Sequence, residues 1–463
     1  MNALSTLAPS RIERRVLSNG LTLVWQPMPW LRTAAYTLWL PGGYVAEYPV
    51  SAVQSVEGKD VDADAASPPT GISSTLPEDP EQDPRAGLAS LVCEMIQRGA
   101  GGYSSRQLVA AEDNLGIDAS GSASISTASF SASMPAESLP QAIELLADVV
   151  RRPHLPADQL EDAKLMLRQE MLACRDEPVQ RLMRRLRERQ YGWRLGRSGL
   201  ATPASLSALD INDVRDFFTT HYHAGGSILA VAGRFDEDAL PDLVERAFGD
   251  WKGGHWPGQP DASPRDGAEH LEIATSQTHI GFAFDSIPYG HPDYFVMRAG
   301  IGILSDGMSS RLFDRVREQR GLCYSVWANT HSLPCVGSVF GYAGTTPPRA
   351  QETLDVTLHE IQHLVDDIRA DELERWKTRI QSSLIMEQES AGSRAGSLAA
   401  DQFQIGEILP TEQLEEKIES ITLEQVVDYW RHHAPQHFRV VTAGPEPLRT
   451  DSASRPEQGE PRP

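Results

Sequence analysis

The feature that most constrains the fold is an internal repeat. The letters ADQLEDAK, which begin at Ala157, resemble the letters ADELERWK, which begin at Ala370, and an amphipathic stretch precedes each of them. Ahead of each predicted helix pair lies an alternating, strand-like sequence, at 122–134 and at 325–344. The sequence therefore predicts one unit, an antiparallel sheet covered by helices, present twice. The predicted fold class is α+β with two homologous halves.

Stretches of loop composition set the predicted domain limits. Residues 48–85 are rich in Pro and Ser and hold eight carboxylates between Glu57 and Asp83, with Lys59 as the only cation in that interval. Such a stretch cannot bury enough apolar surface to offset chain entropy, so it is predicted to be a disordered insert. The resulting division is an N-terminal half at 1–248 that includes the insert, a Gly- and Pro-rich linker at 249–269, a C-terminal half at 270–445, and a disordered tail at 446–463.

Charge and hydropathy exclude several classes of partner. The chain has 463 residues, with 42 Lys and Arg against 64 Asp and Glu, and a formal net charge of −22. This balance argues against nucleic acid and against anionic membrane surfaces. The apolar run at 227–233 is far shorter than the roughly 20 residues that span a bilayer. The first 15 residues lack a signal-peptide pattern, and four cysteines without paired spacing indicate a reduced compartment. A cytoplasmic protein is expected.

Several motifs resemble one peptidase family. The segments Ser18–Leu23, Leu40–Glu47 and Gly87–Met95 resemble the opening of the pitrilysin/insulinase zinc peptidases, which include mitochondrial processing peptidase and its bacterial relatives. The most specific match is Leu304–Val326, with the letters LSDGMSSRLFDRVREQRGLCYSV. The resemblance covers nearly the whole chain outside the acidic insert and the tail. It implies two homologous halves, each an α+β peptidase-like domain.

The zinc motif of that family is degenerate in this chain. The family places H-x-x-E-H on one helix, where two imidazoles grip Zn²⁺ and the Glu polarises the metal-bound water. In this sequence the resemblance puts Ser90 and Glu94 at the two His positions and Cys93 at the position of the base. Only the distal carboxylate ligand survives, as Glu170. We expect no metal and no intact catalytic residue here. The alternative is a substitute metal site made of Ser90, Cys93, Glu94 and Glu170.

A second zinc pattern lies in the C-terminal half. His359 to His363 reads HEIQH and fits H-E-x-x-H, which in thermolysin-like enzymes supplies two ligands and a base from one helix. The apolar positions of the predicted helix, however, lie on its other face, so both histidines are predicted to face solvent. A metal site at His359 and His363 stays open as an alternative.

The resemblance also assigns a role to the C-terminal half. In the family an Arg and a Tyr seven residues apart reach the substrate from that half, and Arg317 and Tyr324 match them. An Arg offers charge-assisted donors, and a Tyr hydroxyl can donate to a peptide carbonyl or a developing oxyanion. The alternative is that both residues only pack against a strand.

Three functions remain open at this stage. The favoured one is a non-catalytic subunit that forms a heterodimer with a zinc-bearing homologous peptidase and contributes Arg317 and Tyr324 to the binding of a peptide substrate. Zinc is then expected in the partner and not in this chain. The second is a structural or peptide-binding homologue. The third is an active metalloendopeptidase that uses Glu170 or the pair His359 and His363.

Overall fold

The computed structural model describes residues 11–48, 82–256 and 258–450. Contacts between residues divide the chain into two compact units. We call Glu13–Leu172 with Ser198–Pro260 the N-terminal unit, and Ala173–Arg197 with Asp261–Pro463 the C-terminal unit. Most of the insert predicted at 48–85, and most of the tail predicted at 446–463, lie outside the described residues.

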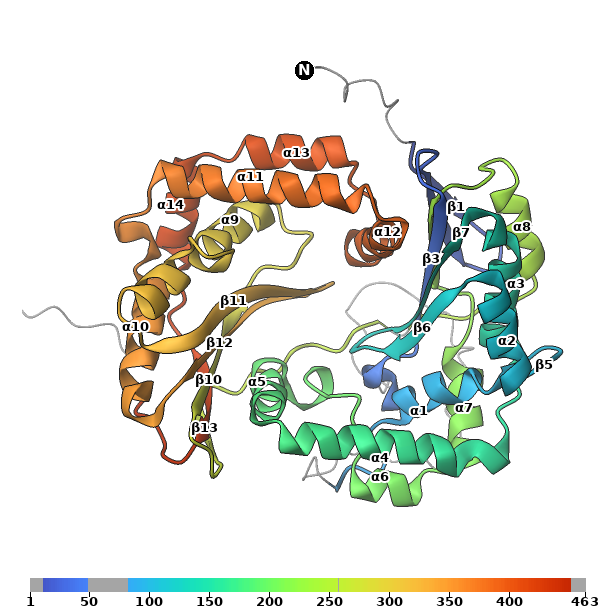
Figure 1. Ribbon diagram of the computed structural model, residues 1–463, viewed down its shortest axis with the longest axis horizontal. Helices are drawn as coiled ribbons and strands as arrows, with labels where there is room; N and C mark the ends of the chain where they lie inside the picture. The colour runs from blue at the N-terminus through green and yellow to red at the C-terminus, as the bar shows by residue number, and fades with distance from the viewer. Residues whose placement is uncertain (1–10, 49–81, 257, 451–463) are drawn as a thin grey trace, which may run out of the picture. The chain divides into compact units, whose positions relative to one another are not determined.

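Each unit contains one large sheet (Figure 1), and the two sheets have the same strand order apart from the additional edge strand β1 of the N-terminal sheet. The N-terminal sheet runs β1–β2–β8–β3–β7–β6, and the C-terminal sheet, read from its matching edge, runs β9–β13–β10–β12–β11. The N-terminal strands are β1 Glu13–Val16, β2 Thr22–Pro27, β3 Thr33–Leu40, β6 Asp118–Ala123, β7 Ala128–Pro135 and β8 Ile228–Gly233. The C-terminal strands are β9 Gly267–Glu272, β10 Thr278–Ser286, β11 Cys323–Leu333, β12 Val336–Thr345 and β13 Arg439–Gly444. The predicted duplication of an α+β unit is confirmed.

One detail of both sheets differs from the prediction. The last strand of each half pairs in parallel, β8 with β2 and β13 with β9, whereas the sequence predicted antiparallel sheets. The reason is topological, because these strands return to the sheet after long helical connections, as parallel pairing requires. Strand β9 begins at Gly267, within the last residues of the stretch predicted as a linker.

Helices pack on these sheets. In the N-terminal unit they are α1 Leu88–Ile96, α2 Ser105–Leu115, α3 Leu139–Arg151, α4 Leu160–Asp176, which runs into the boundary between the units, α6 Pro203–Ala208, α7 Ile211–His221 and α8 Leu240–Phe248, with the small hairpin β4 Gly99–Ala100 and β5 Tyr103–Ser104. In the C-terminal unit they are α5 Pro178–Leu195, α9 Tyr294–Ser305, α10 Ala350–Gln362, α11 Ala370–Glu387, α12 Ala391–Ile405, α13 Thr411–Glu419 and α14 Leu423–His433. A π-helical segment, Leu312–Glu318, completes the C-terminal unit.

Helix α5 lies within the first half of the sequence but packs on the C-terminal sheet, against β10 and β13. A glycine on β10, Gly281, makes this contact possible, because a Cβ there would overlap the side chain of Leu182. Gln190 of α5 donates from Nε2 to Asp285 Oδ1 at 2.8 Å and to Ser338 Oγ at 2.9 Å. Contacts therefore assign this helix to the C-terminal unit, although it precedes residue 248 in the sequence. The domain limit at 248 stays a prediction.

The two chain ends that flank the undescribed residues 49–81 are held together. Tyr48 and Asp83 are only 4% and 3% exposed, and the Tyr48 hydroxyl donates to Asp83 Oδ1 at 2.7 Å. The backbone carbonyl of Asp83 accepts a hydrogen bond from Thr202 Oγ1 at 2.8 Å. The connection is thus closed by buried hydrogen bonds before the acidic stretch begins.

We expect removal of residues 50–81 to leave the stability of the protein nearly unchanged, because closure entropy depends only weakly on loop length. Extending the deletion to Pro84 removes Asp83 and leaves the buried Tyr48 hydroxyl without its acceptor, which should cost about 1–3 kcal/mol. Urea denaturation of the two deletion variants measures the difference. A large loss already with the shorter deletion would show that the acidic stretch packs on the fold.

Candidate functional site

Helix α1 carries the residues that the sequence resemblance aligns with a zinc motif, and its start is fixed by a buried carboxylate. Glu47 is fully buried, and its Oε1 accepts the backbone N–H of Ala89 at 3.1 Å. A carboxylate is stabilising there because the first N–H groups of a helix are unpaired and carry partial positive charge. The residue before the helix, Gly87, has φ +80° and lies so close to Ala201 that a Cβ would collide with its backbone. The helix is thus held rigidly.

Two positions that hold zinc-binding and catalytic groups in the family are used for packing. Ser90 donates its hydroxyl to the backbone carbonyl of Gly199 at 2.9 Å. Cys93 is buried, with its Sγ 3.3 Å from the hydroxyl of Tyr222. Burial raises the pKa of Cys93 to about 12, which outweighs the hydrogen bond to Tyr222. The sulfur is therefore a neutral thiol, whereas metal binding and nucleophilic attack both need the thiolate.

The two carboxylates of the predicted site serve other purposes or face solvent. Glu94 forms an ion pair with Arg98 at 2.9 Å, one turn further along α1. Glu170 is exposed on α4. Within the described residues no three His, Cys, Asp or Glu side chains gather as a metal site. The four residues do not fit a zinc ion, because they offer no imidazole, a protonated thiol and a carboxylate already paired with a cation.

The literal H-E-x-x-H pattern does not converge on one point either. His359 and His363 are exposed near the end of α10, with ring centroids 4.2 Å apart, and His363 Nδ1 lies 2.9 Å from Asp366 Oδ2. Glu360, which would be the base, points to the other side, where it pairs with Arg315 at 2.7 Å and is largely buried. The apolar face of α10, with Leu354, Leu358 and Ile361, is buried as its spacing predicts.

Tyr324 is presented by a β-bulge. The register between β11 and β12 shifts between Cys323, which pairs with Thr345, and Ser325, which pairs with Gly344. Tyr324 is the additional residue, and such bulges re-aim a side chain. Its side chain is 49% exposed. A polar aromatic residue is thus held on a sheet with about half of its surface exposed.

The Tyr324 hydroxyl belongs to a small polar cluster. It donates to Gln277 Oε1 at 2.9 Å and lies 3.2 Å from the hydroxyl of Tyr342. Tyr342 lies in turn 2.8 Å from His279 Nδ1, and burial lowers the pKa of His279. No motif in the sequence marks Gln277, His279 or Tyr342, because only the pairing of β10, β11 and β12 brings them to Tyr324.

Arg317 lies in the π-helical segment before β11. Its guanidinium stacks over the ring of Phe313 at 4.5 Å, and its Nε lies 3.5 Å from Glu318 Oε1. The side chain is 41% exposed. Arg317 also lowers the pKa of Cys323, although burial raises that pKa more strongly, to about 11. Arg317 and Tyr324 thus both keep polar groups at the surface of one unit.

The anchor of this segment is Arg311, which is 2% exposed. Its guanidinium pairs with both carboxylate oxygens of Glu372, at 2.9 and 2.8 Å, and with Asp367 at 2.6 Å. A fourth bond runs from Nη1 to the carbonyl of Leu364 at 2.9 Å. Arg311 therefore ties the segment that carries Arg317 to the chain between α10 and α11.

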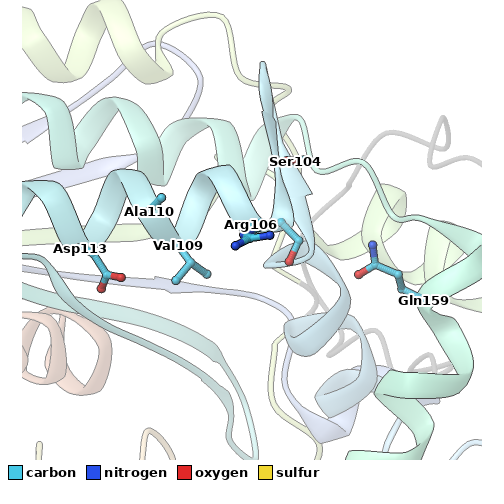
Figure 2. A pocket seen from close by; sticks show the side chains of 7 residues that line it. Ser104, Arg106, Val109, Ala110, Asp113 and Gln159 are labelled. Atoms are coloured by element: carbon cyan, nitrogen blue, oxygen red, sulfur yellow. The ribbon is translucent and has the colours of Figure 1, made fainter.

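A hollow on the N-terminal unit contains none of these residues. It has a volume of about 670 Å³ and lies along α2. Figure 2 shows Arg106, Val109 and Asp113 along this helix and Gln159 from a neighbouring turn. The hollow is an open surface groove.

Two copies of one α+β unit in a single chain, with the motif Leu304–Val326 in the second copy, define a chain of the duplicated metallopeptidase type. The family model described as "Insulinase (Peptidase family M16)" matches residues 80–203, and the model described as "Peptidase M16 inactive domain" matches residues 208–380. The chain belongs to the insulinase (M16) peptidase family. The resemblance stated from the sequence is thereby confirmed.

Individual relatives agree with this assignment. An uncharacterized zinc protease of Rickettsia felis is 23% identical over 350 residues, which cover 75% of this chain and 85% of that protein. The fold is similar to a crystal structure described as a peptidase M16 inactive domain from Pseudomonas fluorescens, with a TM-score of 0.79, 20% identity, and coverage of 96% of this chain and 100% of that one. A chain of complex III from Candida albicans matches with a TM-score of 0.72, 17% identity, and coverage of 94% and 96%. At 20% and 17% identity, these two structures show that the fold is shared and do not show a shared function.

Proposed function

We propose that this protein is a non-catalytic M16 subunit that works with a zinc-bearing homologous peptidase. The observation that carries the proposal is the contrast between the two units. On α1 the family's catalytic positions are taken by Ser90, Cys93 and Glu94, each engaged in a packing or pairing contact. On β11 Tyr324 stays half exposed with its hydroxyl at the surface. This contrast supports a chain that leaves the zinc chemistry to a partner and contributes to substrate binding.

The chemistry assigned to this chain is the binding of a peptide substrate. Arg317 and Tyr324 offer donors for peptide carbonyls, and a positioned donor stabilises charge that develops on a carbonyl oxygen. Zinc and its bound water, together with the general base, would come from the partner. Support comes from the family model described as inactive domain, which matches residues 208–380 and so includes both residues.

A purely structural role is the second candidate. It is favoured by the similarity of fold to a chain of the Candida albicans respiratory complex. A neighbouring gene that encodes an intact H-x-x-E-H chain would favour the first candidate. The direct test is affinity purification of the native protein under mild conditions. Recovery of a homologous zinc peptidase in a stable one-to-one complex supports the proposal, and a complex without any such chain contradicts it.

We expect the isolated protein, purified without chelator, to contain much less than one equivalent of zinc and to cleave no unstructured peptide. The physical reason is that neither imidazole nor thiolate is available on α1. Elemental analysis and a peptidase assay measure both quantities. One equivalent of zinc that is lost in Glu170→Gln would contradict the expectation at α1, and loss in His359→Ala with His363→Ala would locate the metal at the end of α10.

The described residues contain no helix that is long and apolar enough to cross a membrane. A cytoplasmic location stays a prediction.

A further inference from the structure

The hydrogen bond between Tyr324 and Gln277 has a chemical meaning beyond packing. The Tyr324 hydroxyl donates to Gln277 Oε1 at 2.9 Å, and this oxygen belongs to a carboxamide. A carboxamide oxygen is the same kind of acceptor as the carbonyl oxygen of a peptide bond. The position that Tyr324 would offer to a peptide is therefore filled by an amide group of the chain itself.

The direction of the hydrogen bonds behind Tyr324 follows from counting protons. A Tyr hydroxyl has one proton, and that of Tyr324 is used toward Gln277, so Tyr342 must donate to the oxygen of Tyr324. The oxygen of Tyr342 then accepts from the nitrogen Nδ1 of His279, 2.8 Å away. The chain runs from His279 through Tyr342 to Tyr324, and it ends in a proton that points outward at an amide oxygen.

Sheet geometry fixes the inner members of this chain. His279 and Tyr342 are each 5% exposed and lie on the neighbouring strands β10 and β12. Gly344 lies beneath the two hydroxyls, and a Cβ at this position would overlap both of them. The absence of a side chain at Gly344 therefore lets the phenols of Tyr324 and Tyr342 meet.

Gln277 is held differently. It precedes β10 and is half buried, and its backbone N–H donates to Thr275 Oγ1 at 3.3 Å. Its carboxamide makes one side-chain hydrogen bond among the described residues, the bond to Tyr324. Rotation about its side-chain torsions would withdraw the amide oxygen from Tyr324 without any change in the sheet. The donor is thus preorganised, and its present acceptor is exchangeable.

We propose that the carboxamide of Gln277 is an intramolecular competitor that takes the place of a peptide carbonyl at the Tyr324 hydroxyl, and that Tyr342 positions this donor. The proposal rests on the proposed function in taking Tyr324 as a donor to an extended peptide. It predicts that replacing Gln277 by an apolar residue strengthens peptide binding, whereas loss of a polar side chain at a binding site usually weakens it.

The test uses the full chain labelled with 3-fluorotyrosine and observed by fluorine NMR. The protein has 11 tyrosines, and the resonance of Tyr324 is assigned by its loss in Tyr324→Phe. The probe is an uncharged Gly-Ser octapeptide, acetylated and amidated, which offers amide carbonyls but no side-chain anchor. The matched variants are Gln277→Met, which keeps the length without the acceptor, and Gln277→Glu, which keeps an acceptor oxygen.

We expect Gln277→Met to shift the Tyr324 resonance in the absence of peptide and to lower the dissociation constant of the octapeptide about two- to ten-fold, the factor that one net hydrogen bond supplies. Gln277→Glu should bind the octapeptide no better than the unaltered chain. In the Gln277→Met background, Tyr342→Phe should weaken binding of the octapeptide again and should shift the Tyr324 resonance, as a positioning residue requires. It should also lower the melting temperature, because the buried His279 donor loses its acceptor.

The proposal is overturned if Gln277→Met and the unaltered chain show the same Tyr324 resonance and the same affinity, or if the Tyr324 resonance does not respond to the octapeptide in any variant. These measurements need no partner and no cleavage. Failure of the proposed function is seen elsewhere, as normal cleavage by a complex that contains Tyr324→Phe, so the two failures are distinguishable.

Discussion

Replacing Tyr324 by Phe is expected to lower the cleavage rate of the complex with the zinc-bearing partner by about 10²–10³-fold, since that is the usual effect of removing one preorganised donor to a developing oxyanion. The substitution deletes a single hydroxyl from a side chain that is 49% exposed. Assembly of the two chains and thermal stability should therefore not change. Single-turnover cleavage by the reconstituted complex measures the rate, and gel filtration with thermal unfolding measures the rest.

A matched control separates this effect from a general loss of tyrosine hydroxyls. Tyr103 lies in β5 of the N-terminal unit and is also exposed. Tyr103→Phe should leave the cleavage rate within a factor of two. Arg317→Ala should act like Tyr324→Phe and should also weaken substrate affinity, because a cationic donor is lost. If a complex with both Tyr324→Phe and Arg317→Ala cleaves its substrate normally, the shared-site proposal is wrong and a structural role remains.

The duplicated fold could be predicted because its signals are local. Alternation along β7 buries Ala128, Phe130, Ala132 and Met134 and leaves the residues between them at the surface or half buried. The same helix-opening letters recur at Ala157 and Ala370. The placement of α5 could not be predicted, because it depends on the missing side chain at Gly281 and on bonds from Gln190 to residues about 100 and 150 positions away.

The candidate site shows the same division between local and long-range information. Comparison with the family motif indicated that Ser90, Cys93 and Glu94 are unsuited to zinc. It could not indicate that Cys93 is a buried thiol beside Tyr222, since 129 positions separate them. Tyr324 was identified from a local motif. Its neighbours Gln277 and Tyr342 reach it only through strand pairing, and a single sequence carries no signal for such a cluster.

The largest effect on stability is expected for Arg311. Its side chain is 2% exposed, and its guanidinium donates hydrogen bonds to Glu372, Asp367 and the carbonyl of Leu364. Burial acts to raise the pKa of Glu372, but the hydrogen bonds from Arg311 and from the backbone of Arg369 outweigh it, so the pKa lies below its ordinary value. The carboxylate is therefore charged, and it depends on Arg311 for its compensation.

Arg311→Ala should lower the free energy of unfolding by about 3–5 kcal/mol, the usual cost of leaving one partner of a buried ion pair uncompensated. Urea denaturation measures the loss. The control is Arg320→Ala, because Arg320 is 52% exposed and lies 4.0 Å from Glu352, so its loss should cost less than about 0.5 kcal/mol. Equal costs for the two variants would contradict the assignment of Arg311 as the anchor.

A double substitution distinguishes a charge left alone from a hole left in the core. Arg311→Met with Glu372→Leu removes both charges and keeps similar volume, so it should be clearly more stable than Arg311→Ala. Its free energy of unfolding should still be about 1 kcal/mol below that of the unaltered protein. The reason is that Glu372 Oε2 also accepts the N–H of Arg369 at the start of α11, and leucine cannot. If the double variant is no more stable than Arg311→Ala, packing and not charge compensation sets the cost. Arg311 immediately precedes Leu312–Glu318, the segment that carries Arg317. If the double variant is stable, the cleavage rate of its complex shows whether the position of Arg317 depends on the ion pair between Arg311 and Glu372.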